Sequence, residues 1–253
     1  MTKKLCKDQK KNLVAKLKPL FHGLASEEID EAVSEAKKGN DLETIEEHKN
    51  ILAKLFDDWM ETFRVVNCSK VIIEMFLEQK EEAVKKMSEI WTEMYAGETL
   101  KSLADRGIYL GIPVVPRPYM TIYGLMLMVR NGENVGYTYL DPNKLSDVVE
   151  TPDKPYFMFN VEDGRDMLGK SPKKSEELIK KKERSCLVDN EGIALCIHAD
   201  VLSHHNVDCT GSRYERGDGV PSVCLRDGKP GLSSDGIGSS DDEWGSASCR
   251  SRG

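Results

Sequence analysis

The sequence lacks the features that mark several large classes of protein. No apolar run approaches the roughly 18 residues that a membrane-spanning helix needs, and the basic start, MTKKLCKDQKK, is not followed by the apolar stretch of a secretory signal. There is no glycine-rich loop with the Walker spacing and no GxGxxG after a predicted strand, so ATP-driven and dinucleotide redox chemistry have no direct support. The sequence identifies no cofactor, and we expect a cytoplasmic protein without a membrane segment.

Closely spaced cysteine pairs of the CxxC type are also absent. The seven cysteines are irregularly spaced, which predicts free thiols in a reducing compartment. The 43 acidic residues exceed the 36 basic ones, and the net charge of −7 argues against nucleic acid as a partner. The basic run over 170–184 is interpreted as a solvated helix face. What remains is a chain of 253 residues, 39% hydrophobic, which is long enough to bury a substantial core.

The first hundred residues are dominated by helical periodicity. Apolar residues recur at steps of three and four from Leu42 to Val66 and again from Val71 to Met94. The interruption at 67–69 leaves two alternatives, an antiparallel helical hairpin or one long bent helix. Further helices are expected over 26–39 and 100–105.

From Gly107 onward, prolines and β-favouring runs replace the helical pattern. The runs on either side of NGEN at 131–134 predict one hairpin, and VPSVCLR and PGLSS on either side of 227–229 predict another. PYFMFNVE at 155–162 predicts a strand, and residues 231–240 predict a mobile loop. The sequence therefore predicts an α+β protein with a helical region over 1–107, containing the helical hairpin, and a mostly antiparallel sheet domain with a few helices over 108–253.

Two helix starts are expected within this second region. Pro172 follows Ser171, and proline is favoured at the first position of a helix. Asp189 precedes NEGIALCIHADVL and has the side chain of a typical N-cap.

Several short motifs of the C-terminal half occur in an order that resembles a known family. They are YFMFNVEDGRD at 156–166, the Ser-Pro helix start at 171, EGIAL at 191–195, GSR at 211–213, VPS at 220–222 and WGSASC at 244–249. The set is similar to a family of uncharacterised, mainly bacterial proteins that is classed as a domain of unknown function. The resemblance implies a shared fold and no particular activity. Where relatives carry a tryptophan-rich apolar segment, this chain has LSSDGIGSSDDE at 232–243.

The same resemblance implies that the chain end belongs to the fold. We therefore expect Trp244 to be packed and Ser246 to Cys249 to form a terminal strand. Only the residues from Arg250 to Gly253 are expected to fray.

Arginines at glycine-containing turns are the leading candidates for a binding site. Arg165 and Asp166 lie in DGRD, Arg213 ends GSR, and Arg216 follows shortly afterwards. At such turns, backbone amides and planar guanidinium groups converge on phosphate or carboxylate. The leading hypothesis is a binding module for a small anionic ligand. The open alternative is that Arg165 and Arg213 fasten turns by bonding carbonyl groups or aspartates.

Cysteines and histidines near the C-terminus support two further hypotheses. Cys249 follows four small residues and precedes Arg250, so it is the candidate nucleophile of a thiol-dependent enzyme with His198 as its base. Cys196, His198 and Cys209 are candidate metal ligands, but on a helix Cys196 and His198 lie about 200° apart. We therefore predict no metal site and interpret the cysteines as structural thiols.

The helical half offers a third class of function, that of a protein-interaction or scaffold protein that forms homo-oligomers. A set of large, soft apolar side chains suits a partner helix. Packing within the helical hairpin explains the same residues with fewer assumptions. The set consists of Trp59, Met60, Phe63, Met75, Phe76, Met87, Trp91 and Met94.

Overall fold

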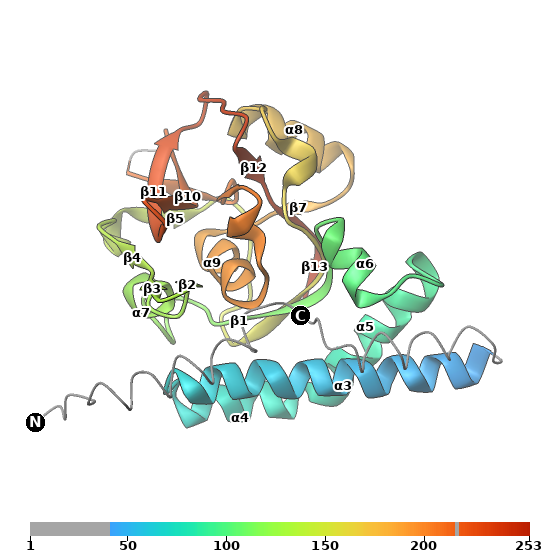
Figure 1. The fold of residues 1–253 in the computed structure, drawn as a ribbon. Coiled ribbons are helices and arrows are strands. Elements are labelled where there is room, and N and C mark those ends of the chain that lie inside the picture. The colour runs from blue at the N-terminus through green and yellow to red at the C-terminus, as the bar shows by residue number, and fades with distance from the viewer. Residues whose placement is uncertain (1–40, 216–217) are drawn as a thin grey trace, which may run out of the picture.

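Four helices form the N-terminal part of the structure, a computed structural model that describes residues 41–215 and 218–253. They are α3 (Asp41–Val65), α4 (Lys70–Glu78), α5 (Lys80–Met94) and α6 (Leu100–Asp105). Figure 1 shows α3 running along α4 and α5, so the hairpin alternative is the one adopted. The predicted helix over 26–39 and the candidate residue Arg216 lie outside the described residues.

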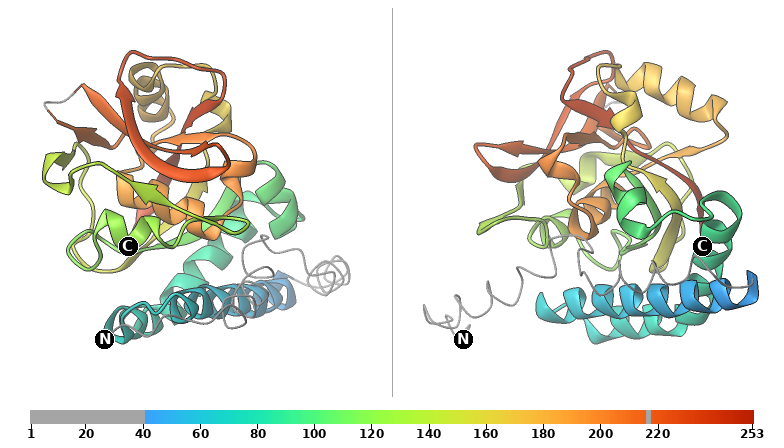
Figure 2. Two further views of the ribbon diagram at one scale, coloured as in Figure 1. Left: turned by 60° about the vertical axis from the view of Figure 1, so that its left-hand side comes forward. Right: turned by 45° about the vertical axis from the view of Figure 1, so that its right-hand side comes forward.

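The apolar stripes of these helices face the C-terminal half. Phe56 and Trp59 of α3 place their rings 5.7 and 6.0 Å from that of Phe157. The helical layer covers one side of the sheet region in every view (Figures 1 and 2). The main hydrophobic core extends from Leu52 to Cys249, and a small second cluster contains Met167, Ile179 and Cys186. The large aromatic residues of the helices are therefore core residues. None of the helices in the described part of the chain combines the length and the apolar character that a membrane span requires.

An antiparallel four-stranded sheet lies against the helical layer. Its order is β1 (Ile108–Val114), β6 (Tyr156–Glu162), β13 (Ser248–Arg252) and β7 (Ser185–Cys186). The last strand of the chain therefore lies inside the sheet, with β6 on one side and β7 on the other. The chain end is packed as expected, but the predicted terminal strand over 246–249 is wrong in its bounds, because Ser246 ends a strand of the other sheet and the last strand runs from Ser248 to Arg252. The expectation that the chain frays from Arg250 is also wrong.

A buried ion pair holds this last strand in place. Glu191 is fully buried, and its Oε1 accepts hydrogen bonds from Nε of Arg252 and from the Tyr156 hydroxyl, both at 2.6 Å. Its Oε2 accepts from Nη2 of Arg252 at 2.8 Å and from the Val188 N–H at 2.9 Å. Arg252 also donates to Oγ of Ser185 at 2.7 Å. The contact explains why the chain end is ordered, because both charged groups are satisfied only when β13 is in register.

The second sheet has seven strands and is mixed. Its main path is β12 (Trp244–Ser246), β8 (Asn206–Asp208), β10 (Gly219–Arg226), β11 (Lys229–Gly236) and β4 (Tyr137–Thr138), with β5 (Leu145–Asp147) and β9 (Ser212–Tyr214) attached. The β10–β11 hairpin is confirmed, and its pairing continues as far as Gly219 and Gly236. The expectation of a loop over 231–240 is thus wrong up to Gly236, because a complete ladder and the buried Leu232 hold these residues.

Three further helices complete the fold. They are α7 (Ile122–Met126), α8 (Pro172–Lys181) and α9 (Asp189–His198), with the 3-10 turns η1 (Pro142–Lys144), η2 (Arg165–Met167) and η3 (Val201–Ser203) and the small hairpin β2 (Arg130–Asn131) and β3 (Asn134–Val135). The hairpin at NGEN is correct, but most of the run before it is helical because Oγ1 of Thr121 caps the N–H of Gly124 at 3.3 Å.

Helix α9 packs against β1 of the first sheet and β10 of the second (Figure 1). Nine of its ten residues are buried, so it is a central element of the domain. Asp189 is its first helical residue and Val188 is its N-cap, which corrects the predicted start by one position. The side chain of Asp189 is therefore free for other contacts.

Candidate ligand-binding site

The DGRD turn is held together by its own charged residues. Asp163 is fully buried, and both of its carboxylate oxygens lie 3.1 Å from Nε of Arg165. Arg165 also places Nη2 2.7 Å from Oδ2 of Asp163 and bonds the carbonyl group of Asp105. Burial acts to raise the pKa of Asp163, but the His205 ring, whose Nε2 lies 3.4 Å from Oδ1, and hydrogen bonds from Arg165 outweigh it and hold the pKa below its ordinary value. Asp166 is exposed and faces Lys182 at 3.4 Å.

Close packing explains the glycine of this turn. Gly164 has a φ of 103°, a left-handed conformation that favours glycine. A Cβ atom at this position would lie 2.7 Å from the carbonyl carbon of Gly245 in β12. The DGRD and WGSASC motifs are thus two sides of one backbone contact.

Arg213 is also committed to protein groups. Its Nη1 donates to the carbonyl oxygens of Thr210 and Ser212 at 2.8 and 2.9 Å, and its Nη2 lies 2.6 Å from Oε1 of Glu176. Arg165 and Arg213 share no partner among their hydrogen bonds and ion pairs. The contacts of both are those of arginines that fasten turns.

Cys249 and the ring nitrogens of His198 are buried in different surroundings. Cys249 is fully buried, and burial, with the charge of Glu191 adding to it, raises the pKa of its thiol to about 12. His198 lies among the rings of Trp59 and Phe63, with centroids 6.1 and 5.2 Å away, and burial lowers its pKa to about 3. Neither ring nitrogen of His198 has a hydrogen-bond partner among the described residues, so the structure does not bring it into hydrogen-bond contact with Cys249.

The candidate metal ligands are separated in the same way. Cys196 and His198 lie on α9, and the helical conformation points them to different sides. Cys209 packs against Gly192, where a Cβ atom would lie 2.2 Å from its sulfur. Within residues 41–215 and 218–253, no group of three or more His, Cys, Asp or Glu side chains is arranged to hold a metal ion.

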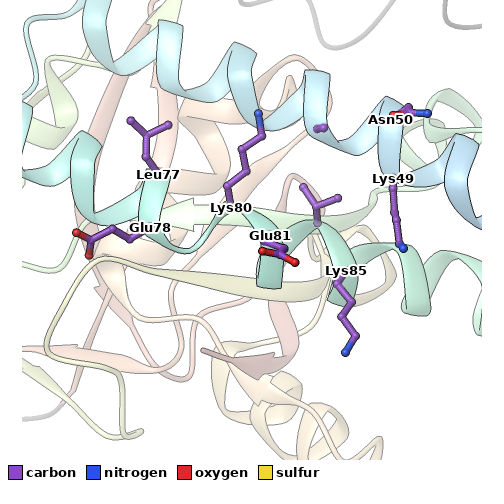
Figure 3. A pocket seen from close by; sticks show the side chains of 9 residues that line it. Lys49, Asn50, Leu77, Glu78, Lys80, Glu81 and Lys85 are labelled. Carbon is purple, nitrogen blue, oxygen red and sulfur yellow. The ribbon is translucent and has the colours of Figure 1, made fainter.

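A groove between α3 and the α4–α5 pair carries several lysines (Figure 3). Lys80 lies 2.6 Å from Asp57, Lys49 3.6 Å from Glu46, and Lys85 4.0 Å from Glu89. Every lysine that lines the groove therefore has an acidic partner. The groove therefore offers an anionic ligand no lysine without an acidic partner.

An unusual asparagine lies in the centre of the first sheet. Asn160 of β6 is fully buried and has a φ of 49°, a conformation that asparagine tolerates better than most residues. Its Oδ1 accepts a hydrogen bond from the Tyr95 hydroxyl at 3.0 Å, and its Nδ2 lies 3.1 Å from Sδ of Met94. Its carbonyl oxygen accepts from Nη2 of Arg184 at 2.6 Å. Residues in such conformations are concentrated at functional sites, so the side chains around Asn160 are candidates for a binding site.

Arg184 and Arg250 meet beside Asn160. Phe159 and Val161 pair with Ser251 and Cys249, so Asn160 stands opposite Arg250 on the neighbouring strand. Nη1 of Arg250 lies 3.7 Å from the Met94 sulfur that Asn160 also contacts. Arg250 is exposed.

Arg184 differs from Arg250 in being almost completely enclosed. Its side chain is 7% exposed, and Nε donates to Oγ of Ser248 at 2.8 Å, while Nη1 lies 3.3 Å from Glu162. Burial lowers the pKa of Arg184, and the positive charge of Arg250 also acts to lower it. The cluster of Tyr95, Asn160, Arg184 and Arg250 thus combines a buried and an exposed guanidinium group.

Sequence reasoning missed this cluster for identifiable reasons. Arg184 ended a basic run that was assigned to a solvated face, and Arg250 was assigned to a fraying end. The alternation of Ser248, Arg250 and Arg252, which continues the period of a strand, was the signal available for the second. A lone asparagine inside an otherwise apolar strand, FMFNVE, was the signal for Asn160.

A comparison with protein families places the chain in a wider group. The profile of DUF5701, described as a family of unknown function, matches residues 70–252. The chain belongs to this family. The DUF5701 match starts at α4, upstream of the motifs that carry the resemblance in the sequence, and it includes Tyr95, Asn160, Arg184 and Arg250. No curated protein and no solved structure matches the chain.

Proposed function

We propose that the protein is a binding module for a small anionic ligand, held by Arg250 close to the positive charge of Arg184 and beside Tyr95 and Asn160. The observation that carries the proposal is the state of Arg250. Its guanidinium group is exposed, and its one hydrogen-bonding contact among the described residues is with the Met94 sulfur. A thioether is a weak acceptor, so most of the five N–H donors of this arginine face no acceptor within residues 41–215 and 218–253.

The surroundings of Arg250 favour an anion over other ligands. The N–H groups of Arg184 are bound to Ser248, Asn160 and Glu162, so this arginine contributes through its positive charge. An anion held by Arg250 would offset the repulsion between the two guanidinium groups. A guanidinium group binds carboxylate and phosphate through two parallel hydrogen bonds. The Tyr95 hydroxyl is held near the same position by Asn160. The Tyr95 hydroxyl donates its proton to Asn160, so the directed donors for a ligand are the N–H groups of Arg250.

This proposal keeps the anionic ligand expected from the sequence but changes the residues that hold it. Arg165 and Arg213 have their guanidinium groups filled by Asp163, Glu176 and carbonyl oxygens, so they have little capacity left for a ligand. The thiol-dependent enzyme and the scaffold role stay predictions. Neither has a contact in the described residues that favours it over the anion site.

The proposal is tested by titrating the full chain with inorganic phosphate, pyrophosphate and acetate at low ionic strength, followed by calorimetry. We expect at least one of these anions to bind the wild type and the affinity to fall at least about tenfold in Arg250→Gln, because a charge-assisted bidentate contact is worth about 1.5–3 kcal/mol. Arg250→Lys should keep part of the affinity, since it keeps the positive charge but loses the two parallel N–H donors of the guanidinium group.

A matched control separates a specific site from general attraction. Arg64→Gln removes the same charge from an exposed arginine on α3, which is paired with Glu61 at 3.5 Å. We expect this variant to bind like the wild type. Equal weakening by the two substitutions, or the absence of binding by the wild type to every probe, would contradict the proposal.

A further inference from the structure

A second polar centre lies at the start of α9, among residues that the proposed anion site does not use. Asp189 is completely buried, and its Oδ1 lies 3.1 Å from Nε of Arg117 and 3.4 Å from Oγ of Ser212. Arg117 also pairs with Oδ1 of Asp147, which accepts a hydrogen bond from Oγ of Ser212 at 2.7 Å. The other carboxylate oxygen of Asp189, Oδ2, is buried and has no hydrogen-bond partner among the described residues.

Two carboxylates share one guanidinium group in this centre. Among the described residues, Arg117 is the one cationic side chain within ion-pair distance of either Asp147 or Asp189. When both aspartates are ionised, the centre therefore carries one uncompensated negative charge beside an oxygen that accepts no hydrogen bond. Burial of such a charge is costly, and either a proton or a bound cation removes the cost.

The acid–base properties of the centre agree with its excess of one negative charge. Burial, which Arg117 opposes and Asp147 reinforces, raises the pKa of Asp189 to about 6. The shift persists although the first turn of a helix favours negative charge. The thiol of Cys209 is also close, but burial raises its pKa well above 9, so it stays neutral. Asp189 is therefore the group of this centre that exchanges a proton near neutral pH.

The centre is connected to the surface through its two outer residues. The side chains of Arg117 and Asp147 are 23% and 26% exposed, whereas that of Asp189 is not exposed at all. Because Asp189 is enclosed, a ligand reaches its carboxylate only if neighbouring side chains move, which restricts the ligand to a small group.

We propose that Asp147 and Asp189 form a binding site for the ammonium group of a small primary amine. An R–NH3+ group supplies the one positive charge that the centre lacks and N–H donors for Oδ2 of Asp189 and for Asp147. Binding exchanges a proton for the amine: the O–H bond of protonated Asp189 breaks, the proton passes to the solvent, and the ammonium group takes its place. The centre is neutral before and after the exchange.

Proton release makes the proposal directly measurable in the wild type. The full chain is titrated with methylammonium chloride at constant ionic strength, in pairs of buffers with different ionisation enthalpies. We expect close to one proton to be released per amine at pH 5 and almost none at pH 8, where Asp189 is already ionised. The affinity should rise about tenfold from pH 5 to pH 7. Tetramethylammonium chloride has the same charge but no N–H, and it should not bind.

Variants assign the effect to these residues. Asp189→Asn keeps the shape of the side chain and should abolish methylammonium binding, whereas Asp153→Asn, at an exposed position, should bind like the wild type. If Asp189→Asn does not fold, the measurement of proton release by the wild type still tests whether the ammonium group replaces a proton in this centre. Absence of methylammonium binding, binding without proton release at pH 5, equal binding of tetramethylammonium, or full binding by a folded Asp189→Asn would each overturn the proposal. The outcome is independent of the anion site, since the two share no residue.

Discussion

The contact between Glu191 and Arg252 should be the largest single polar contribution to the stability of the C-terminal strand. In Arg252→Met, the fully buried Glu191 would keep only the Tyr156 hydroxyl at 2.6 Å and the Val188 N–H at 2.9 Å, and would lose both bonds to the guanidinium group. Removing one partner of a buried ion pair costs about 3–5 kcal/mol. Proteins of this size have a total free energy of unfolding of about 5–15 kcal/mol, so the loss is a large fraction of it.

Urea unfolding and thermal melting both measure this effect. At about 2–4 °C per kcal/mol, the expected fall in Tm of Arg252→Met is roughly 6–20 °C. The double variant Glu191→Gln with Arg252→Met should lose less than the sum of the two single variants, because the second substitution removes a charge that the first has left unpaired. Lys144→Met breaks the exposed contact with Glu215 and serves as the control, with no resolvable shift expected. An Arg252→Met protein that unfolds with wild-type Tm would refute the account of how the chain end is held.

Three further predictions follow from the described residues. Gly164→Ala should destabilise the protein by about 1–3 kcal/mol in urea unfolding, because of its left-handed φ and the nearby backbone of β12, whereas Gly132→Ala, with no atom within 4 Å of the added Cβ, should cost less. Burial, reinforced by the charge of Asp235, raises the pKa of Asp208 from 3.8 to about 7. The folded chain therefore binds more protons than the unfolded chain, and the free energy of unfolding should fall as the pH rises from about 4 to about 7. Asp208→Asn should raise the Tm at pH 8 but not at pH 4. The described cysteines are all buried, so native Cys6→Ser protein should react with a thiol reagent only after unfolding, and rapid reaction in the native state would contradict their placement.

Local sequence signals were sufficient for most of the elements. The helical stripe from Leu42, the Ser-Pro start of α8 and the strand at 156–162 all appear as expected, because each depends on periodicity or on caps within a few residues. The helix at 122–126 was not predicted, because a short apolar run does not distinguish a strand from a helix and the Thr121 cap is a single local signal. The strand character of β13 was underestimated because its anchor, Glu191, is 61 residues away from Arg252 in the sequence.

The candidate site was harder to predict than the fold. Motifs located Arg165 and Arg213 at turns, but a sequence does not show whether a guanidinium group is already filled by protein acceptors. The arrangement around Asn160 depends on Tyr95, 65 residues away, and on the pairing of β6 with β13. Such long-range juxtapositions follow only from the folded chain.

The most direct test of the anion site is the response of the arginine Nε–H signals to inorganic phosphate, measured by NMR on labelled protein. The account predicts that the signals of Arg250 and Arg184 shift together and saturate at one phosphate concentration, while that of Arg165, which is bound to Asp163, stays in place. Saturable shifts elsewhere with Arg250 and Arg184 unmoved would contradict the account.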